Sequence, residues 1–347
     1  MRYFLSLIFA STIALTSTTC HQPTEPPSNG SDTTSHAWNF TVYKFGDGGS
    51  SDLYDVAIIN DTLAYAVGEI YLKDSTGQLE YLPHNIAVWD GRQWDIKKIS
   101  VSFRGNNITT PIEGICALSR DDIWLIAGDP IHGDGNNWID DDIRAILGDN
   151  QLELSRAWAA SPSSIYFVGR SGSLLLYSGN NFRKINATTT LNFYDVYGSG
   201  GQVMAVASNP FTGYDRKIVQ LNGTTATTIS DSPIAWPLMG VWFVPGHYYV
   251  VGQGIYEKTS LLDPVWRQDS IDTVDFFSCI RGNAWNDFFV AGGYGQLLHF
   301  NGKSWQSYQN VLGLQSGAIG RIAVRGNTMM LVGMLGSQAV VVVGRRR

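Results

Sequence analysis

The sequence predicts an all-β protein, a seven-bladed β-propeller of four-stranded antiparallel blades, and two observations carry this prediction. The first is composition: the 347 residues include 37 glycines and 12% aromatic residues but only 16% charged residues. This balance suits short strands and tight turns better than helices, whose surfaces need charge. The second is a unit of four apolar runs that occurs seven times, at intervals of 38 to 59 residues. Repeats of about 40–50 residues with four strands each are typical of propellers.

The second run of each repeat aligns most easily, because it usually ends in glycine. In chain order it reads AYAVGE, IWLIAGD, IYFVGR, VMAVAS, YYVVGQ, FFVAGG and MMLVGM. One apolar run precedes it and another follows it, which in the second repeat is IRAILGDN (143–150). A fourth run closes most repeats, often with an early aromatic residue, as in RQWDIKKI and KSWQSY. We name these predicted strands A, B, C and D, joined by tight turns.

The two ends of the chain predict how the ring closes. The seventh repeat stops after its strand C, AVVVVGRRR, and lacks a strand D. The segment 36–46 precedes the first strand A, and its Trp38 stands where Trp94, Trp266 and Trp305 stand in strands D. We therefore expect the N-terminal strand to complete the last blade, which removes an open sheet edge. The propeller is predicted to span residues 37–347.

The cysteines within the repeats predict no disulfide. Cys116 and Cys279 fall on innermost strands of blades 2 and 6, which are not neighbours in a seven-bladed ring. A disulfide needs Cα atoms about 6 Å apart. We expect two buried free thiols.

The N-terminus is similar to a bacterial lipoprotein signal over residues 1–20. Arg2 precedes an apolar stretch from Tyr3 to Leu15, too short to span a bilayer, and small residues lead into Cys20. In such lipoproteins this cysteine is acylated, although Ser17 and Thr19 depart from the usual residues before it. Residues 21–36, rich in Pro, Ser and Thr, are predicted to be a disordered tether. We expect an exported, membrane-anchored protein, periplasmic or at the cell surface; the alternative is a plainly secreted one.

The repeats resemble those of bacterial β-propeller lipoproteins with BNR-like or kelch-like repeats, over residues 37–347. The resemblance concerns architecture, since the Asp-box Ser-x-Asp-x-Gly-x-x-Trp is not matched by the corresponding turns, VWDGRQW and HFNGKSW. Chains of this type are sometimes labelled glucosyltransferase-like. No Gly-rich phosphate loop or helix-rich α/β region supports transfer chemistry here.

Binding is expected at three long B–C loops, residues 68–85 of blade 1, 128–142 of blade 2 and 208–217 of blade 4. The B–C and D–A connections of a propeller share one face, and long insertions on a rigid ring are where binding tends to occur. Trp138, Tyr81 and Tyr214 are candidates for an aromatic sugar platform; the alternative is that they pin their own loops. The ligand-binding candidates are Tyr81, His84, His132, Asp134, Asn136, Trp138, Tyr214 and Arg216.

Two further sets of residues are candidates for chemistry. Five residues lie at strand A entrances near the channel mouth, either as a site or as the neutralised lining of a wet channel: Asp55, Glu113, Arg156, Asp195 and Arg321. Asp134, Asn136 and Asp140 resemble a loose calcium loop, although the EF-hand order is absent and an acidic solvated loop is the alternative. No other cofactor is predicted.

These observations favour a binding module for an extracytoplasmic glycan or protein partner rather than an enzyme. The alternatives are a scaffold subunit of an envelope assembly and a carbohydrate-active hydrolase or lyase. No Ser-His-Asp arrangement is recognisable among the six scattered histidines. The net charge of −6, without a basic stripe, argues against nucleic acid.

Overall fold

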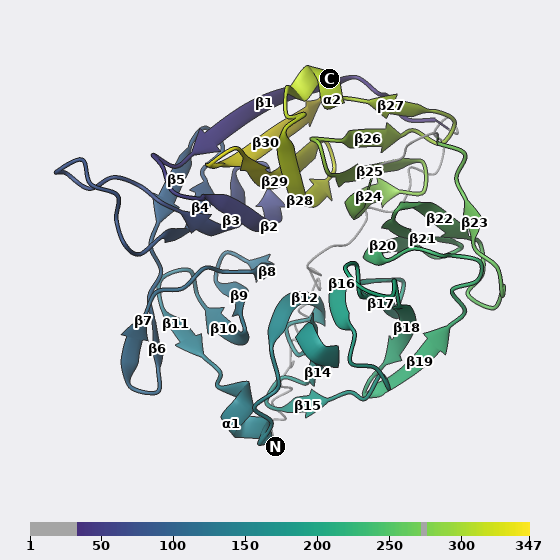
Figure 1. Ribbon diagram of the computed structural model, residues 1–347, viewed down its shortest axis with the longest axis horizontal. Helices are drawn as coiled ribbons and strands as arrows, with labels where there is room; N and C mark the ends of the chain where they lie inside the picture. The colour runs from purple at the N-terminus through teal and green to yellow at the C-terminus, as the bar shows by residue number, and fades with distance from the viewer. Residues whose placement is uncertain (1–32, 272–275) are drawn as a thin grey trace, which may run out of the picture.

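Seven antiparallel sheets form a ring in the computed structural model, which describes residues 33–271 and 276–347 (Figure 1). The predicted seven-bladed propeller is confirmed. Blade 1 contains β2 (Asp52–Asn60), β3 (Leu63–Ile70), β4 (His84–Trp89) and β5 (Trp94–Lys97). Blade 2 contains β8 (Gly114–Ser119), β9 (Asp122–Ala127), β10 (Asp129–Gly133) and β11 (Trp138–Asp140), extended by β6 (Val101–Phe103) and β7 (Asn106–Ile108). Blade 3 contains β12 (Leu154–Ser161), β13 (Ser164–Gly169), β14 (Leu174–Tyr177) and β15 (Phe182–Lys184).

The other four blades follow in chain order around the ring. Blade 4 contains β16 (Asn192–Ser199), β17 (Gln202–Ser208), β18 (Arg216–Asn222) and β19 (Thr225–Ile229). Blade 5 contains β20 (Leu238–Val244), β21 (His247–Gly252), β22 (Gly254–Lys258) and β23 (Arg267–Gln268). Blade 6 contains β24 (Phe277–Ala284), β25 (Asp287–Gly292), β26 (Leu297–Phe300) and β27 (Trp305–Ser307). Blade 7 contains β28 (Gly317–Arg325), β29 (Thr328–Leu335), β30 (Gln338–Arg346) and β1 (Trp38–Phe45).

The helical elements are short. They are α1 (Ile143–Leu147), α2 (Gln309–Leu312) and the 3-10 turn η1 (Arg170–Gly172). None of the helices in the described ranges is long and apolar enough to cross a membrane.

The N-terminal strand closes the ring, as predicted. β1 pairs with β30 along eight residues, from Trp38 opposite Arg346 to Phe45 opposite Ala339. The chain ahead of β1 is docked as well: the Thr34 amide donates to the Asn301 carbonyl at 3.0 Å, and the hydroxyl of Tyr308 donates to the His36 carbonyl. The last residues of the predicted tether therefore bind blade 6, a correction to its boundary. The predicted signal segment with Cys20, and the rest of the tether up to residue 32, lie outside the described residues.

A hydrogen-bonded side-chain chain joins this N-terminal segment to blade 6. Nδ1 of His36 lies 2.8 Å from Nδ1 of His299, and Nε2 of His299 lies 2.9 Å from Oδ1 of Asp287. Nε2 of His36 lies 3.1 Å from the Ser304 hydroxyl. Arg346 also donates to Asp287. Ring closure thus includes two facing imidazoles that share one hydrogen bond.

The repeated glycine at the end of strand B has a steric cause. A Cβ on Gly68 would lie 2.2 Å from the Asp52 carbonyl oxygen at the start of the neighbouring strand A, and one on Gly169 would lie 2.0 Å from the Glu153 oxygen. Gly252, Gly292 and Gly333 meet the same obstacle. Because any side chain would strike backbone, the close approach of strands A and B in these five blades requires glycine.

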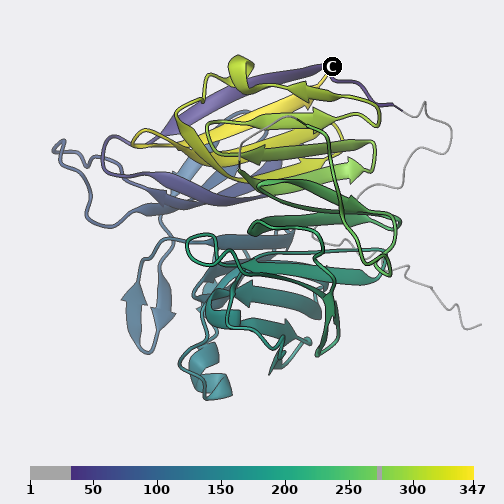
Figure 2. The same cartoon turned by 45° about the vertical axis from the view of Figure 1, so that its right-hand side comes forward.

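Blade 2 departs from the predicted arrangement, and this corrects the expected loop at 128–142. Residues 129–133 form β10 and residues 138–140 form β11, so only Gly128 connects strands B and C. The segment 143–147, predicted as a strand, is the helix α1. The hairpin β6–β7 adds two outer strands, β6 running parallel to β11, and it projects from the ring (Figure 2).

Cys116 and Cys279 are buried and form no disulfide with each other, which confirms the prediction. The sulfur of Cys279 accepts a hydrogen bond from the Ile322 amide of blade 7 at 3.3 Å. Burial raises the pKa of the Cys279 thiol above its usual value.

Candidate functional site

Bulges near the start of strand A direct one residue of six blades toward the ring centre. The strand register shifts just before Asp55, Arg156, Asp195, Gly240, Cys279 and Arg321. A bulge inserts an extra residue and re-aims its side chain. Four of the five residues predicted at the channel mouth stand at this position; the fifth, Glu113, lies one residue before it in blade 2.

Two of these residues, Arg156 and Arg321, bind backbone carbonyls of several blades. The guanidinium of Arg156 donates to the carbonyls of Glu113 and Ser155, the latter at 2.7 Å, and reaches Tyr54 of blade 1 at 3.4 Å. Burial, with repulsion from Arg321, lowers the pKa of Arg156 to about 10.

Arg321 makes the matching contacts on the other side of the ring. It donates to the carbonyls of Ser278 at 2.9 Å and Gly320 at 3.1 Å, and it also reaches Tyr194 of blade 4. The two arginines therefore satisfy carbonyls of six blades.

The channel carboxylates are bonded to backbone amides of the next blade. Asp55 accepts from the Ile115 amide at 3.1 Å, and Asp195 accepts from the Val241 amide at 3.0 Å. Asp195 also holds Arg281 through two bonds of 2.9 and 2.7 Å. Burial opposes ionisation of Asp195, but the charge of Arg281 outweighs it and keeps the pKa of this carboxyl below its usual value. The two amide bonds join adjacent blades, and the Asp195–Arg281 pair joins blade 4 to blade 6.

We define the loop face as the face formed by the B–C and D–A connections. Two of its B–C loops are long, residues 71–83 of blade 1 and 209–215 of blade 4, as expected. All five exposed aromatic side chains of the described residues lie on it: Tyr81, Phe211, Tyr214, Trp236 and Tyr294. Tyr81 is 93% exposed and Phe211 is 86% exposed. Exposed aromatic residues of this kind mark interaction surfaces.

Backbone strain gathers on the same face. Among the described residues, the non-glycine residues with positive φ are Arg104, Ser171, Thr188, Tyr214 and Tyr294. All five lie in B–C or D–A connections. Such conformations cost about 1–3 kcal/mol each and concentrate at functional sites. Two of the five are also exposed tyrosines.

The blade 1 loop is held in shape by its own hydrogen bonds. Oδ1 of Asp74 accepts from the amides of Thr76 and Gln78 at 2.8 and 3.1 Å, which forms the tip of the loop. The Glu80 amide donates to the Leu72 carbonyl at 2.9 Å, and Lys98 forms an ion pair with Glu80. A preformed loop loses less conformational entropy when it binds. Tyr81 therefore projects from a fixed platform.

Acids and phenols meet where this loop reaches the channel mouth. Glu69 accepts from the hydroxyls of Tyr54 at 2.5 Å and Tyr71 at 3.0 Å. Asp52 pairs across the strands with Glu69. Burial, with a smaller contribution from Glu69, raises the pKa of Asp52 to about 7. The side chain of Glu113, predicted for the channel, instead binds Arg170 on this face at 3.3 Å.

The blade 4 loop presents an aromatic corner. The rings of Tyr214 and Trp236 meet edge to face at 5.3 Å. Arg216, predicted as a ligand-binding residue, forms an ion pair with Asp231 at 2.9 Å. Tyr214 thus keeps its predicted place on the loop face, whereas Tyr81 lies on blade 1, so the two do not form one platform with Trp138.

The blade 2 candidates fall away from this face. Asp134 accepts from the amides of Asn136 and Asn137 at 2.9 and 2.7 Å, so it shapes the turn between β10 and β11. The same contacts occur at Asp90 in blade 1, within VWDGRQW. Trp138 packs over Gly133. The proposed calcium ligands Asp134 and Asp140 therefore lie in a turn and on a strand, and no group of three acidic, His or Cys side chains able to hold a metal occurs in the described part of the chain.

The two candidate histidines are apart. His84 opens β4, and burial lowers its pKa. His132 on β10 lies 2.9 Å from Asp122 and stacks on Trp124 at 4.1 Å. The sequence reasoning missed Phe211, Trp236, Tyr294 and Arg281. In the sequence, each of these is only an aromatic residue or an arginine in a connection or a strand. A single sequence does not reveal whether such a side chain is exposed or buried.

Comparisons with known proteins support the fold. No protein-family model and no curated protein matches the sequence. A structure of YCF48 bound to D1 peptide is similar with a TM-score of 0.65 and 15% identity, over 90% of this chain and 98% of that chain. YCF48 from Cyanidioschyzon merolae gives 0.61 and 14%, over 89% and 99%. The WD40 propeller domain of Doa1 gives 0.63 and 10%, over 90% and 98%. At these identities the likeness concerns the fold.

Proposed function

We propose that this chain is a protein-binding propeller whose loop face holds a segment of a partner protein. The observation that carries the proposal concerns the described residues: all five of their exposed aromatic side chains and all five of their strained non-glycine residues lie on one face. Aromatic side chains provide large contact areas and dominate binding energies at protein interfaces. YCF48, a propeller of similar fold, is bound to D1 peptide in one solved structure, which supports this use of the fold.

Site-specific photocrosslinking in the native host tests the loop face. A benzophenone amino acid is placed at Tyr81 or at Tyr294 on the loop face, and in a control protein at Leu262, which is 95% exposed in the C–D turn of blade 5. We expect partner adducts from the first two positions and none from Leu262. Adducts of equal yield from all three positions would contradict a specific loop face.

We further propose that the propeller is exported and anchored to a membrane through an acylated Cys20. The expected partner is then an envelope protein. A scaffold subunit of an envelope assembly, the alternative named above, would also bind such a partner. Labelling with an alkyne fatty acid and fractionation test the anchor. We expect label on the wild-type chain in the membrane fraction, and no label with release into the soluble fraction for Cys20→Ser. Membrane association of the variant equal to that of the wild type would overturn this part alone.

A carbohydrate-active hydrolase or lyase is the second candidate, because Asp52 and Glu69 form a pair of neighbouring carboxyl groups at the channel mouth. A carboxyl with a pKa near 7 can act as a general acid. Assays on a broad polysaccharide panel, with Asp52→Asn as the inactive control, decide this. A glycan partner would appear in the same panel as binding without turnover.

A further inference from the structure

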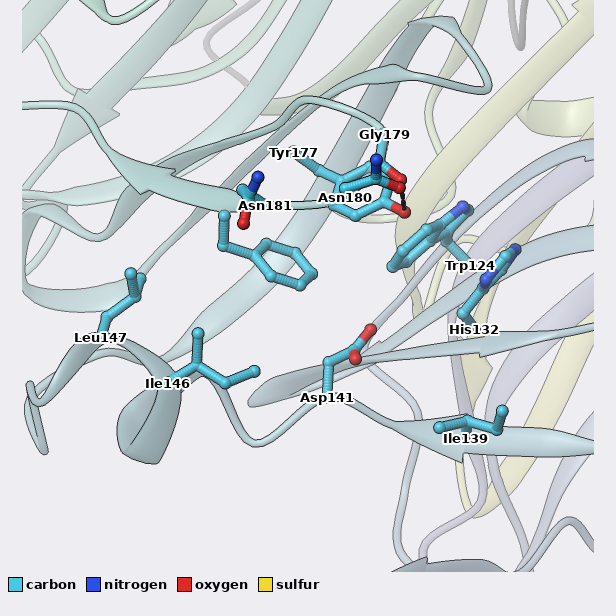
Figure 3. Close-up of a pocket in the computed structure, with 11 residues that line it drawn as sticks. Trp124, His132, Ile139, Asp141, Ile146, Leu147, Tyr177, Gly179, Asn180 and Asn181 are labelled. Atoms are coloured by element: carbon cyan, nitrogen blue, oxygen red, sulfur yellow. Dashed lines mark hydrogen bonds between the residues drawn. The ribbon is translucent and has the colours of Figure 1, made fainter.

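A pocket of about 520 Å³ lies at the rim of the ring between blades 2 and 3, apart from the exposed aromatic residues of the loop face. One wall is aromatic: the ring of Tyr177 lies 4.9 Å from Trp124 and 5.0 Å from Phe182. The amides of Asn180 and Asn181 and the apolar side chains of Ile139 and Ile146 complete the lining (Figure 3). Its volume falls in the range of ligand pockets.

Asp141 is the unusual residue of this pocket. Its carboxylate points into the space beside Trp124 (Figure 3). It is partly buried, and it makes no hydrogen bond or ion pair with any side chain in the described ranges. Burial raises the pKa of Asp141 above its usual value, although the nearby His132, which is bonded to Asp122, opposes this when it is protonated. A carboxylate withdrawn from water without a partner is unfavourable unless a cation or a proton compensates it.

The neighbouring carboxylates already have partners. Asp122 is bound by His132 at 2.9 Å, Asp129 by Arg144 at 2.8 Å, and Asp149 by Lys184. Asp142 is bound by Arg104 at 2.6 Å. Asp140 is also without a partner, but it alternates to the other side of the strand, toward Asp129 and Asp142. The pocket therefore has one carboxylate to offer and no free cation of its own among the described residues.

We propose that this pocket binds a lysine or arginine side chain of a partner chain, with the Asp141 carboxylate holding the charged head and the aromatic wall of Tyr177 and Phe182 packing against its stem. A cation near aromatic faces gains from their quadrupoles, and the aliphatic stem of Lys or Arg buries against apolar surface. Ile139 and Ile146, 69% and 56% exposed, provide apolar contacts at the entrance for the residues that flank the cation.

Binding of fluorescein-labelled octalysine, measured by anisotropy at low salt, tests the charge requirement. Asp141→Asn keeps the shape of the side chain and removes its charge; Asp95→Asn, exposed on β5 of blade 1, makes the same charge change far from the pocket. We expect Asp141→Asn to weaken binding by about tenfold, as for loss of a charged hydrogen bond, and Asp95→Asn by less than twofold. Equal effects of the two variants would show attraction to the net negative surface only and would overturn the proposal.

A second measurement shows whether octalysine binds in this pocket, and it distinguishes a site for a cation from a site for a sugar. The protein is labelled with 5-fluorotryptophan, and the Trp124 resonance is assigned with Trp124→Phe. We expect octalysine to shift this resonance in the wild type but not in Asp141→Asn, and we expect cellotetraose and chitotetraose to leave it unchanged. A shift with either sugar that survives Asp141→Asn would make the pocket a glycan site instead. The octalysine assays need no native partner, so a negative result would overturn the pocket proposal without changing the crosslinks expected from the loop face. The two proposals can therefore be rejected independently.

Discussion

At the scale of single residues, the charged side chains near the channel form hydrogen bonds with backbone groups: the arginines bind carbonyls and the aspartates bind amides. Asp195 has the most connected position, since it links blades 4, 5 and 6 through Val241 and Arg281. Removing one partner of a buried ion pair leaves the other charge without compensation.

We therefore expect Asp195→Asn to lower the free energy of unfolding by about 3–5 kcal/mol. Urea unfolding followed by circular dichroism measures it. Asp95→Asn, whose carboxylate is largely exposed, should change the free energy by less than about 0.5 kcal/mol. A loss below about 1 kcal/mol for Asp195→Asn would show that the Asp195–Arg281 pair does not stabilise the fold.

Asp52 should behave in the opposite way. Its folded pKa, about 7, lies above the usual aspartate pKa of 3.8, so the folded protein binds this proton more tightly than the unfolded chain. Its contribution to stability is therefore full below pH 4 and is lost as the pH rises through 7. We expect Asp52→Asn to stabilise the protein at pH 8 and to have little effect at pH 4, measured as the difference in urea midpoint. A variant less stable than the wild type at pH 8 would contradict this.

The positions of these residues were predictable, but their bonding was not. The sequence places Asp55, Arg156, Asp195 and Arg321 at strand entrances, because the apolar runs locate strand A. Whether a guanidinium reaches solvent, a ligand or a carbonyl of another blade depends on a one-residue bulge, and the apolar pattern does not encode bulges. The loop-face residues Phe211, Trp236 and Tyr294 were missed for a related reason, since the exposure of a side chain depends on neighbouring loops.

At the scale of elements, the repeat was recognisable because each blade needs the same local features. The glycine that ends strand B is required by backbone contact, and the apolar runs are buried. Blade 2 was misassigned because IRAIL has the apolar composition of a strand, although it forms one short helix. GDGNNW is the counterpart of the turn WDGRQW, and its aspartate shapes the turn in the same way.

The closing strand β1 gives an element-scale prediction. A chain that begins at Thr33 keeps the ladder between β1 and β30, whereas a chain that begins at Gly46 leaves the whole edge of β30 unpaired. We expect the first to melt cooperatively and remain monodisperse, and the second to lose cooperative melting or aggregate through the exposed edge. Calorimetry and size-exclusion chromatography measure both. Equal melting temperatures would show that three-stranded closure suffices.

At the scale of the whole molecule, ring closure is linked to pH through His36 and His299. Burial, and for His36 the charge of its neighbour, lower both pKa values below 6.5. Asp287 and Ser304 bind the two ends of the pair, and Arg346 adds positive charge beside it. The contact favours neutral imidazoles, so its contribution is present above pH 6.5 and is lost as the pH falls below that value.

We expect His36→Gln to lower the free energy of unfolding by about 0.5–1.5 kcal/mol at pH 8, the usual value of one hydrogen bond. The difference from the wild type should shrink by pH 5, because the wild type loses the contact there as well. Taking this difference removes the contributions of other groups, including Asp52 and Asp140, whose raised pKa values act in the opposite direction. A difference that is constant from pH 8 to pH 5 would contradict the linkage.

The pairing of β1 with β30 also orders events during protein synthesis. β1 is synthesised before blade 1, whereas its partner β30 is synthesised after blade 6. Blades 1 to 6 can form as their strands emerge, but β1 has no sheet to join until β30 has been made. Its apolar side chains, including Trp38, must therefore be kept from other contacts during that interval. A factor that protects the nascent chain would have to cover this segment until β30 emerges.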